Sequence, residues 1–174
     1  LLTALHCSPD AHADDIAELR ARAQQGDAKA QALLGVLYHM GLGVIVQDYK
    51  QAVVWYRKAA DQGDVDAPFN LGLTYSNGKV VMQNYKQTVF WYRKAADQGD
   101  AYAQSNLGAM YSNGQGVVQN YVQEHKWFNL AAANSTGETH ERAARNRSLV
   151  EKNMTPQQVA EAQRLAGEWQ VRQP

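Results

Sequence analysis

The sequence predicts an all-α fold built from helix-turn-helix repeats, on the strength of three observations. A decapeptide, WYRKAADQGD, occurs twice without change, beginning at Trp55 and at Trp91. Aromatic and glycine positions recur 36 residues apart, as at Tyr49 and Tyr85. Within each period the recurring letters fall at helical spacing, and Gly-rich segments separate them. Self-similarity at a period of about 20–50 residues is the signature of a repeat architecture.

The period divides the chain into three full units with atypical segments at both ends. The units cover residues 26–62, 63–98 and 99–134. Residues 14–25 match the end of a second helix and predict an N-terminal capping half-repeat. Residues 135–174 predict C-terminal capping helices, with helices expected at 138–152 and 156–170. Repeat arrays need such ends because a terminal unit has no neighbour to cover its apolar face.

The first helix of each unit carries a fixed pattern of Ala, Leu, Gly and Tyr. In the first unit these residues are Ala30, Leu34, Gly35 and Tyr38, which fall on one helical face. Glycine inside a helix costs about 1 kcal/mol relative to alanine. Its recurrence at this place therefore predicts a close crossing by the partner helix. The helix is expected to end at a later glycine, Gly41, Gly78 or Gly114.

The second helix of each unit begins at a residue that can cap it, Asp48, Asn84 or Asn120. Its Trp and Tyr residues share a face with recurring alanines, which favours core packing over a stacking surface for bases or sugars. The closing Gln-Gly-Asp ends one helix and caps the next. Glu124 stands where earlier units carry Ala52 and Thr88. We expect it on the helix surface, because the last unit can tolerate a charge there.

Composition and motifs narrow the classes of function. Lys plus Arg and Asp plus Glu number 17 each, so charge gives no reason to expect nucleic acid or an anionic membrane as partner. No stretch approaches the roughly 20 apolar residues of a membrane-spanning helix. The five histidines are scattered and Cys7 is the single cysteine. Phosphate-loop, G-x-S-x-G and H-E-x-x-H motifs are absent. We therefore expect no catalytic residue, metal or cofactor.

The N-terminal residues 1–13 resemble the end of a signal peptide. A short apolar run precedes the triplet Ala11-His12-Ala13, and an Ala-x-Ala triplet after such a run is typical of a signal peptidase site. The alternative is a leader without structure that happens to contain the triplet. Cleavage after Ala13 would indicate export and would leave a mature protein without cysteine.

The repeat letters resemble the Sel1-like repeat family, a relative of the tetratricopeptide repeat. The pattern AQ..LG.MY.NG.GV.QNY followed by W and KAA.QGD carries the resemblance over about residues 14–170. The tail NMTPQQVAEAQRLAGEW also looks like exported bacterial members. Val80 departs from the pattern, which favours glycine there. The resemblance implies a right-handed α-solenoid and a role as adaptor or regulator in protein complexes.

Partner binding is expected where the units differ, on the face of the first helices opposite the core. Phe69 and Tyr102 are candidate anchors, with inter-repeat packing as the alternative. Asn70 and Asn106 resemble asparagines that clamp a peptide backbone in tetratricopeptide proteins, and Lys29 is the one basic candidate. The predicted binding positions are Lys29, Leu33, Val36, Asp66, Phe69, Asn70, Leu73, Tyr102, Ser105, Asn106 and Ala109.

Two classes of function remain open at this point. The first is a non-catalytic adaptor that binds another protein or an extended peptide. The second is an envelope hydrolase acting on peptidoglycan or β-lactams, an activity claimed for cysteine-rich relatives whose paired cysteines this chain lacks. A homo-oligomer formed through the C-terminal helices is compatible with either class.

Overall fold

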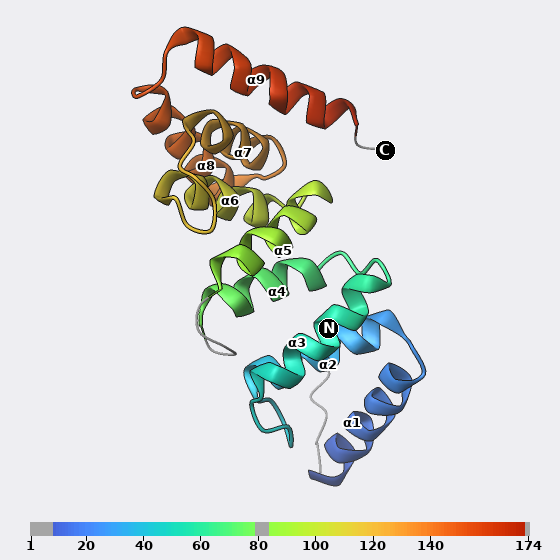
Figure 1. Ribbon diagram of the computed structural model, residues 1–174. Helices are drawn as coiled ribbons and strands as arrows, with labels where there is room; N and C mark the ends of the chain where they lie inside the picture. Colours follow the sequence, from blue (N-terminus) through green and yellow to red (C-terminus); the bar gives the residue numbers. More distant parts are fainter. Residues whose placement is uncertain (1–8, 79–83, 173–174) are drawn as a thin grey trace. The chain divides into compact units, whose positions relative to one another are not determined.

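The computed structural model describes residues 9–78 and 84–172, and within these ranges every regular element is a helix (Figure 1). This confirms the predicted all-α repeat fold. The helices are α1 (Pro9–Gln24), α2 (Ala28–Met40), α3 (Tyr49–Asp61), α4 (Ala67–Ser76), α5 (Tyr85–Asp97), α6 (Ala101–Asn113), α7 (Tyr121–Ala133), α8 (Gly137–Glu151) and α9 (Pro156–Val171). None of these helices combines the length and the apolar character needed to cross a membrane.

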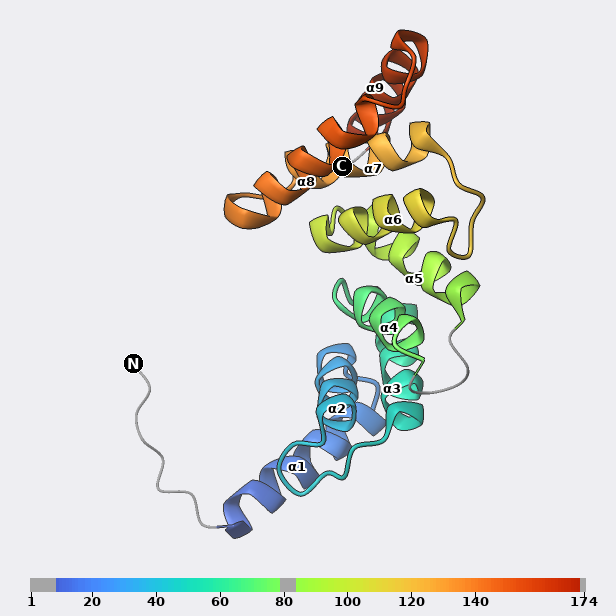
Figure 2. The ribbon, with the colours of Figure 1, turned by 90° about the vertical axis from the view of Figure 1, so that its left-hand side faces the viewer.

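The chain divides into two compact units after Ala67. In the first unit α1 packs against α2, and α2 packs against α3 (Figure 2). In the second unit α5 packs against α6, α6 against α7, and α7 against both α8 and α9. In the second unit, the second helices α5 and α7 therefore each contact the first helix that follows them, as a helical repeat requires.

The recurring glycine of the first helix marks a close contact with an aromatic ring. A Cβ atom on Gly35 would lie 2.6 Å from the Tyr56 ring, and one on Gly108 would lie 2.7 Å from the Phe128 ring. Gly72 meets the Tyr92 ring in the same way. Real Cβ atoms do not approach aromatic carbons so closely, which confirms the predicted close crossing.

The predicted helix caps are present. Asp48 accepts hydrogen bonds from the backbone N–H groups of Lys50 and Gln51 at 2.9 and 3.1 Å. Thr155 and Gln158 form the predicted capping box at the start of α9. Gly41 and Gly114 end α2 and α6 in the left-handed conformation. The other capping side chains that accept a backbone N–H are Asp27, Asp64, Asn84, Asp100 and Asn120.

Much of the aromatic stripe of the second helices lies in the core, as predicted, although Tyr121 is 37% exposed. Trp91, Tyr92 and Trp127 are each no more than 5% exposed. Tyr92 and Trp127 pack in one cluster with Leu107, against which Trp169 of α9 also packs. The indole nitrogen of Trp169 donates to Oδ1 of Asp97 at 3.3 Å. The last helix therefore contacts the second copy of the repeated decapeptide at Asp97.

The N-terminal helix is longer than the capping half-repeat expected from the sequence. Helix α1 begins at Pro9 rather than at residue 14, because proline suits the first helical position and the residues after it are compatible with a helix. The triplet Ala11-His12-Ala13 therefore lies inside α1. Residues 1–8 and Val80 lie outside the described residues, so the leader and the second loop remain predictions.

Candidate partner-binding surface

The predicted binding positions occur in both compact units, and those of the first unit lie mainly on α2. Lys29 and Leu33 are exposed, while Val36 is half-buried. Asp66 is exposed in the segment before α4, where its backbone N–H donates to Oδ1 of Asp64 at 3.1 Å. These side chains offer one positive charge, one negative charge and a small apolar surface.

In the second unit, Phe69 and Tyr102 contact each other. Their ring centroids are 6.2 Å apart, and the Phe69 ring is also 5.8 Å from that of Tyr92. Phe69 is half-buried and packs against the core cluster, whereas Tyr102 is 55% exposed. Phe69 therefore packs between repeats, and Tyr102 is the aromatic residue that keeps surface for a partner. Partner binding by either residue remains a prediction.

The remaining positions in this unit differ in exposure. Asn70, Leu73 and Asn106 are half-buried, and Ala109 is exposed. Ser105 is 7% exposed, so its side chain has little surface to offer a partner. It lies on the buried side of α6 because the recurring core face extends around the helix to this position.

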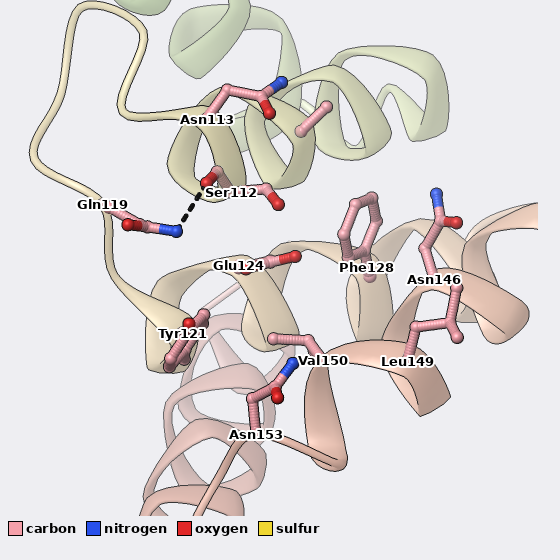
Figure 3. Close-up of a pocket in the computed structure, with 11 residues that line it drawn as sticks. Ser112, Asn113, Gln119, Tyr121, Glu124, Phe128, Asn146, Leu149, Val150 and Asn153 are labelled. Carbon is pink, nitrogen blue, oxygen red and sulfur yellow. Dashed lines mark hydrogen bonds between the residues drawn. The ribbon is translucent and has the colours of Figure 1, made fainter.

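Two cavities open between the first helices of this unit. The smaller, of about 230 Å³, lies between α4, α5 and α6. The larger, of about 440 Å³, lies between α6, α7 and α8 (Figure 3). Ala109 lines both cavities. A predicted binding residue thus stands at the boundary between two adjacent concave sites.

The two cavities occupy equivalent positions between neighbouring repeats, and both lie in the second compact unit. Their lining residues pair at a spacing of 36 on the preceding helices and 40 on the following first helix. The pairs are Ser76 and Ser112, Tyr85 and Tyr121, Thr88 and Glu124, Tyr92 and Phe128, Asn106 and Asn146, Ala109 and Leu149, and Met110 and Val150. Helix α8 therefore takes the place of a fourth first helix, although residues 137–151 lack the repeat letters.

Two substitutions distinguish the larger cavity. In the smaller cavity, the Tyr92 hydroxyl forms side-chain hydrogen bonds with Ser76 and Asn106, which partly offset the rise that burial causes in its pKa. Phe128 has no hydroxyl to do the same in the larger cavity. The neutral Thr88 is replaced by Glu124, which carries a charge. The larger cavity thus lacks this hydroxyl and contains an acidic residue.

Glu124 is buried, which corrects the expectation of a surface position. Its side chain is on the face of α7 that α8 covers, and the residue is only 6% exposed. Figure 3 shows its carboxyl group between Ser112 on α6 and Val150 on α8. Burial raises the pKa of Glu124, and hydrogen bonding with Ser112 acts in the opposite direction. Among the described residues, Oε2 has no hydrogen-bond partner.

Sequence reasoning missed Glu124 and Phe128 as functional candidates. Two signals were available: a charged residue where the earlier repeats carry the small residues Ala52 and Thr88, and a phenylalanine where they carry Tyr56 and Tyr92. Glu124 and Phe128 form a cavity only together with α8, and the sequence of α8 does not show that it packs there.

Comparison with known protein families shows to which family the chain belongs. The Sel1 repeat matches residues 28–64, 65–100 and 101–135, which together make up more than half of the sequence. The chain belongs to the Sel1 repeat family. Sel1 repeat proteins are scaffolds for protein–protein interaction and are in general non-catalytic. Each matched range begins two residues after the unit expected from the sequence.

Solved Sel1 repeat structures resemble this chain. A Sel1 repeat protein from Oxalobacter formigenes is 33% identical, with a TM-score of 0.64, over 75% of this chain and 98% of that one. A protective antigen of uropathogenic Escherichia coli strains, with the same repeat fold, is 30% identical with a TM-score of 0.56. That match covers 88% of this chain and 40% of the antigen.

One further solved structure shares the fold, and one curated protein matches part of the sequence. The cysteine-rich protein B of Helicobacter pylori is 22% identical, with a TM-score of 0.56, over 73% of this chain and 96% of that one. An ERAD-associated E3 ubiquitin-protein ligase component of Arabidopsis thaliana is 34% identical over 65 residues. That stretch is 37% of this chain and 10% of the plant protein, so the chain spans only a small part of this relative.

Proposed function

We propose that this Sel1 repeat protein is a non-catalytic adaptor whose second unit binds an extended segment of another protein across α4, α6 and α8. The observation that carries the proposal is the pair of equivalent cavities on either side of Ala109. An extended segment presents side chains at regular intervals, and successive cavities can receive them while its backbone crosses the helices between.

The chemistry of the surface supports a peptide ligand. Tyr102 offers a half-exposed aromatic ring supported by Phe69, which is the kind of rigid anchor that dominates binding energy at interfaces. Asn106 lines the smaller cavity and Asn146 the larger. Side-chain amides both donate and accept hydrogen bonds, so they can satisfy the main chain of a bound segment.

A selection experiment with matched variants tests this function. Peptides are selected from a displayed random library on the purified protein, and their dissociation constants are measured by fluorescence anisotropy. Ala109→Gln, which places a longer side chain between the cavities, is expected to weaken binding at least tenfold. Ala160→Gln changes another exposed alanine, on α9; it is the control and is expected to leave binding unchanged. Equal affinities for the two variants would refute the proposed surface.

Export to the bacterial periplasm or exterior is part of the same proposal. It is supported by the apolar run before Ala11-His12-Ala13 and by the bacterial origin of the similar solved structures. Cell fractionation after expression with the native upstream sequence, followed by mass spectrometry of the mature N-terminus, tests it. Recovery of the uncleaved chain in the cytoplasm alone would contradict export.

A further inference from the structure

The larger cavity contains a single charge in neutral surroundings. Among its described lining residues, Glu124 is the only one that carries a formal charge at neutral pH. The other polar groups are amides and hydroxyls, including those of Asn113, Asn146 and Asn153. A carboxylate with an oxygen that makes no hydrogen bond is a strong acceptor, and burying it that way is unfavourable. A ligand that donates hydrogen bonds to this oxygen would therefore stabilise the buried carboxylate.

The basic side chains near Glu124 interact with other residues. His125, adjacent to Glu124, lies with Nε2 2.7 Å from Oε1 of Glu151. Arg147 donates to the Asn129 amide oxygen at 2.8 Å, and its Nε lies 3.8 Å from Glu151. Within the described part of the chain, Glu124 takes part in no ion pair. Its charge is thus not compensated by a cation of the same protein.

The preceding unit provides an internal comparison for this cavity. There, Thr88 is neutral and the Tyr92 hydroxyl occupies space between Ser76 and Asn106. At the equivalent positions of the larger cavity, Phe128 has no hydroxyl and Glu124 adds a charge. The larger cavity has a volume of about 440 Å³, against about 230 Å³ for the smaller one. Of the two equivalent cavities, the larger one is therefore also the one that contains a charge.

The walls of the cavity suit a long side chain that ends in a cation. Leu149, Val150 and the Phe128 ring offer apolar contact for a methylene stem. The carboxylate and the amide oxygens offer acceptors for its polar end. A guanidinium group carries five N–H donors in a plane and also stacks favourably on an aromatic ring. An ammonium group has three donors around a point charge and uses such a set less fully.

We propose that the Glu124 cavity binds an arginine side chain of the partner segment, with Glu124 as its carboxylate acceptor. This inference rests on the proposed function and adds the residue type that the partner presents at the larger cavity. It also predicts that the smaller cavity, which lacks a charge, takes a neutral side chain.

Small probes test the assignment without any knowledge of the partner. The purified protein, with ¹³C-labelled glutamate carboxyl groups, is titrated with N-acetylargininamide and followed by NMR. We expect a saturable shift of the Glu124 resonance. The citrulline analogue, a neutral isostere, and the lysine analogue are expected to bind at least several-fold more weakly. No saturable shift, or equal binding of either analogue, would overturn the assignment.

Two variants convert the larger cavity toward the smaller one. Glu124→Thr introduces the residue found at position 88, and Phe128→Tyr restores the hydroxyl found at position 92. Both are expected to abolish the saturable response to the arginine probe while retaining the thermal melting transition. Phe128→Tyr leaves the charge in place, so it tests the role of space separately. Unchanged probe binding in both folded variants would refute the inference.

The outcomes for the two proposals can be told apart. If selected peptides depend on Ala109 while the arginine probe does not bind, only the arginine assignment fails. If the probe binds at Glu124 while peptide affinity is independent of Ala109, the cavity is a cation site and the proposed peptide surface is wrong.

Discussion

Replacing Gly108 by alanine would place a methyl group where the Phe128 ring now lies. The new Cβ would be 2.7 Å from Cε1 of that ring, whereas favourable carbon–carbon contacts are about 3.5–4.0 Å. Phe128 is 3% exposed, so its ring would have to shift within a packed site to make room for the methyl group. Because Phe128 also lines the larger cavity, the contact links the repeat scaffold to the candidate site.

The magnitude follows from two opposing effects. Alanine is a better helix former than glycine by about 1 kcal/mol. Overpacking a tightly filled core costs about 1–3 kcal/mol, and a contact this short on a buried ring belongs in the upper part of that range. We therefore expect Gly108→Ala to lower the free energy of unfolding by about 1–2 kcal/mol. At a typical urea dependence of about 2 kcal/mol per molar, the midpoint falls by about 0.5–1 M.

Gly167 supplies the matched control. It lies in the interior of α9, and a Cβ there would meet nothing within 4 Å. Gly167→Ala is therefore expected to raise stability by about 0.5–1 kcal/mol. Urea unfolding followed by circular dichroism measures both variants. In a Phe128→Leu background, Gly108→Ala should cost less than in the parent chain. A Gly108→Ala variant as stable as the parent would show that the contact with the Phe128 ring is not the reason for a glycine at position 108.

Three further predictions follow from the structure. Glu124→Gln should raise stability at neutral pH by about 1 kcal/mol, the order of the cost of one unsatisfied buried polar group. Burial raises the pKa of Glu124 in the folded state. The protonated carboxyl group therefore contributes stability below the ordinary pKa of 4.5, and this contribution is lost as pH rises through the folded-state pKa. The stability difference between Glu124→Gln and the parent chain should thus shrink toward pH 4. If urea unfolding gave the same difference at every pH, the reasoning would be wrong. Glu151→Ala removes the partner of the fully buried His125 and should cost about 1–3 kcal/mol, whereas Glu151→Gln should cost much less in the same assay. Thr155→Ala should lower stability by about 1 kcal/mol through loss of the capping box; Thr136→Ala, at the start of α8 where the threonine makes no side-chain cap, should change it by less than about 0.5 kcal/mol, and equal losses would contradict the role of the cap.

The repeat positions made the fold predictable. Gly35, Gly72 and Gly108 recur because a ring of the second helix approaches the backbone at the same point in each unit. Caps such as Asp48 and Thr155 act locally, so their function can be inferred from a few neighbouring letters.

The candidate site was less predictable because it depends on a helix outside the repeat pattern. Ala109 was among the predicted binding positions and does line both cavities. Ser105 was also predicted but is buried, since the core extends farther around α6 than the recurring letters show. Glu124 looked like a surface charge at the end of the array. Only the position of α8 shows that this carboxylate is enclosed.

The central claim is that a partner segment lies across the first helices of the second unit. The most direct measurement is an NMR map of backbone amide shifts caused by a selected peptide. The account predicts the largest shifts around Ala109 and Ser112 on α6 and around Asn146 on α8, with little change around Ala160 on α9. Shifts concentrated on α9, or on the helix surfaces away from both cavities, would contradict it.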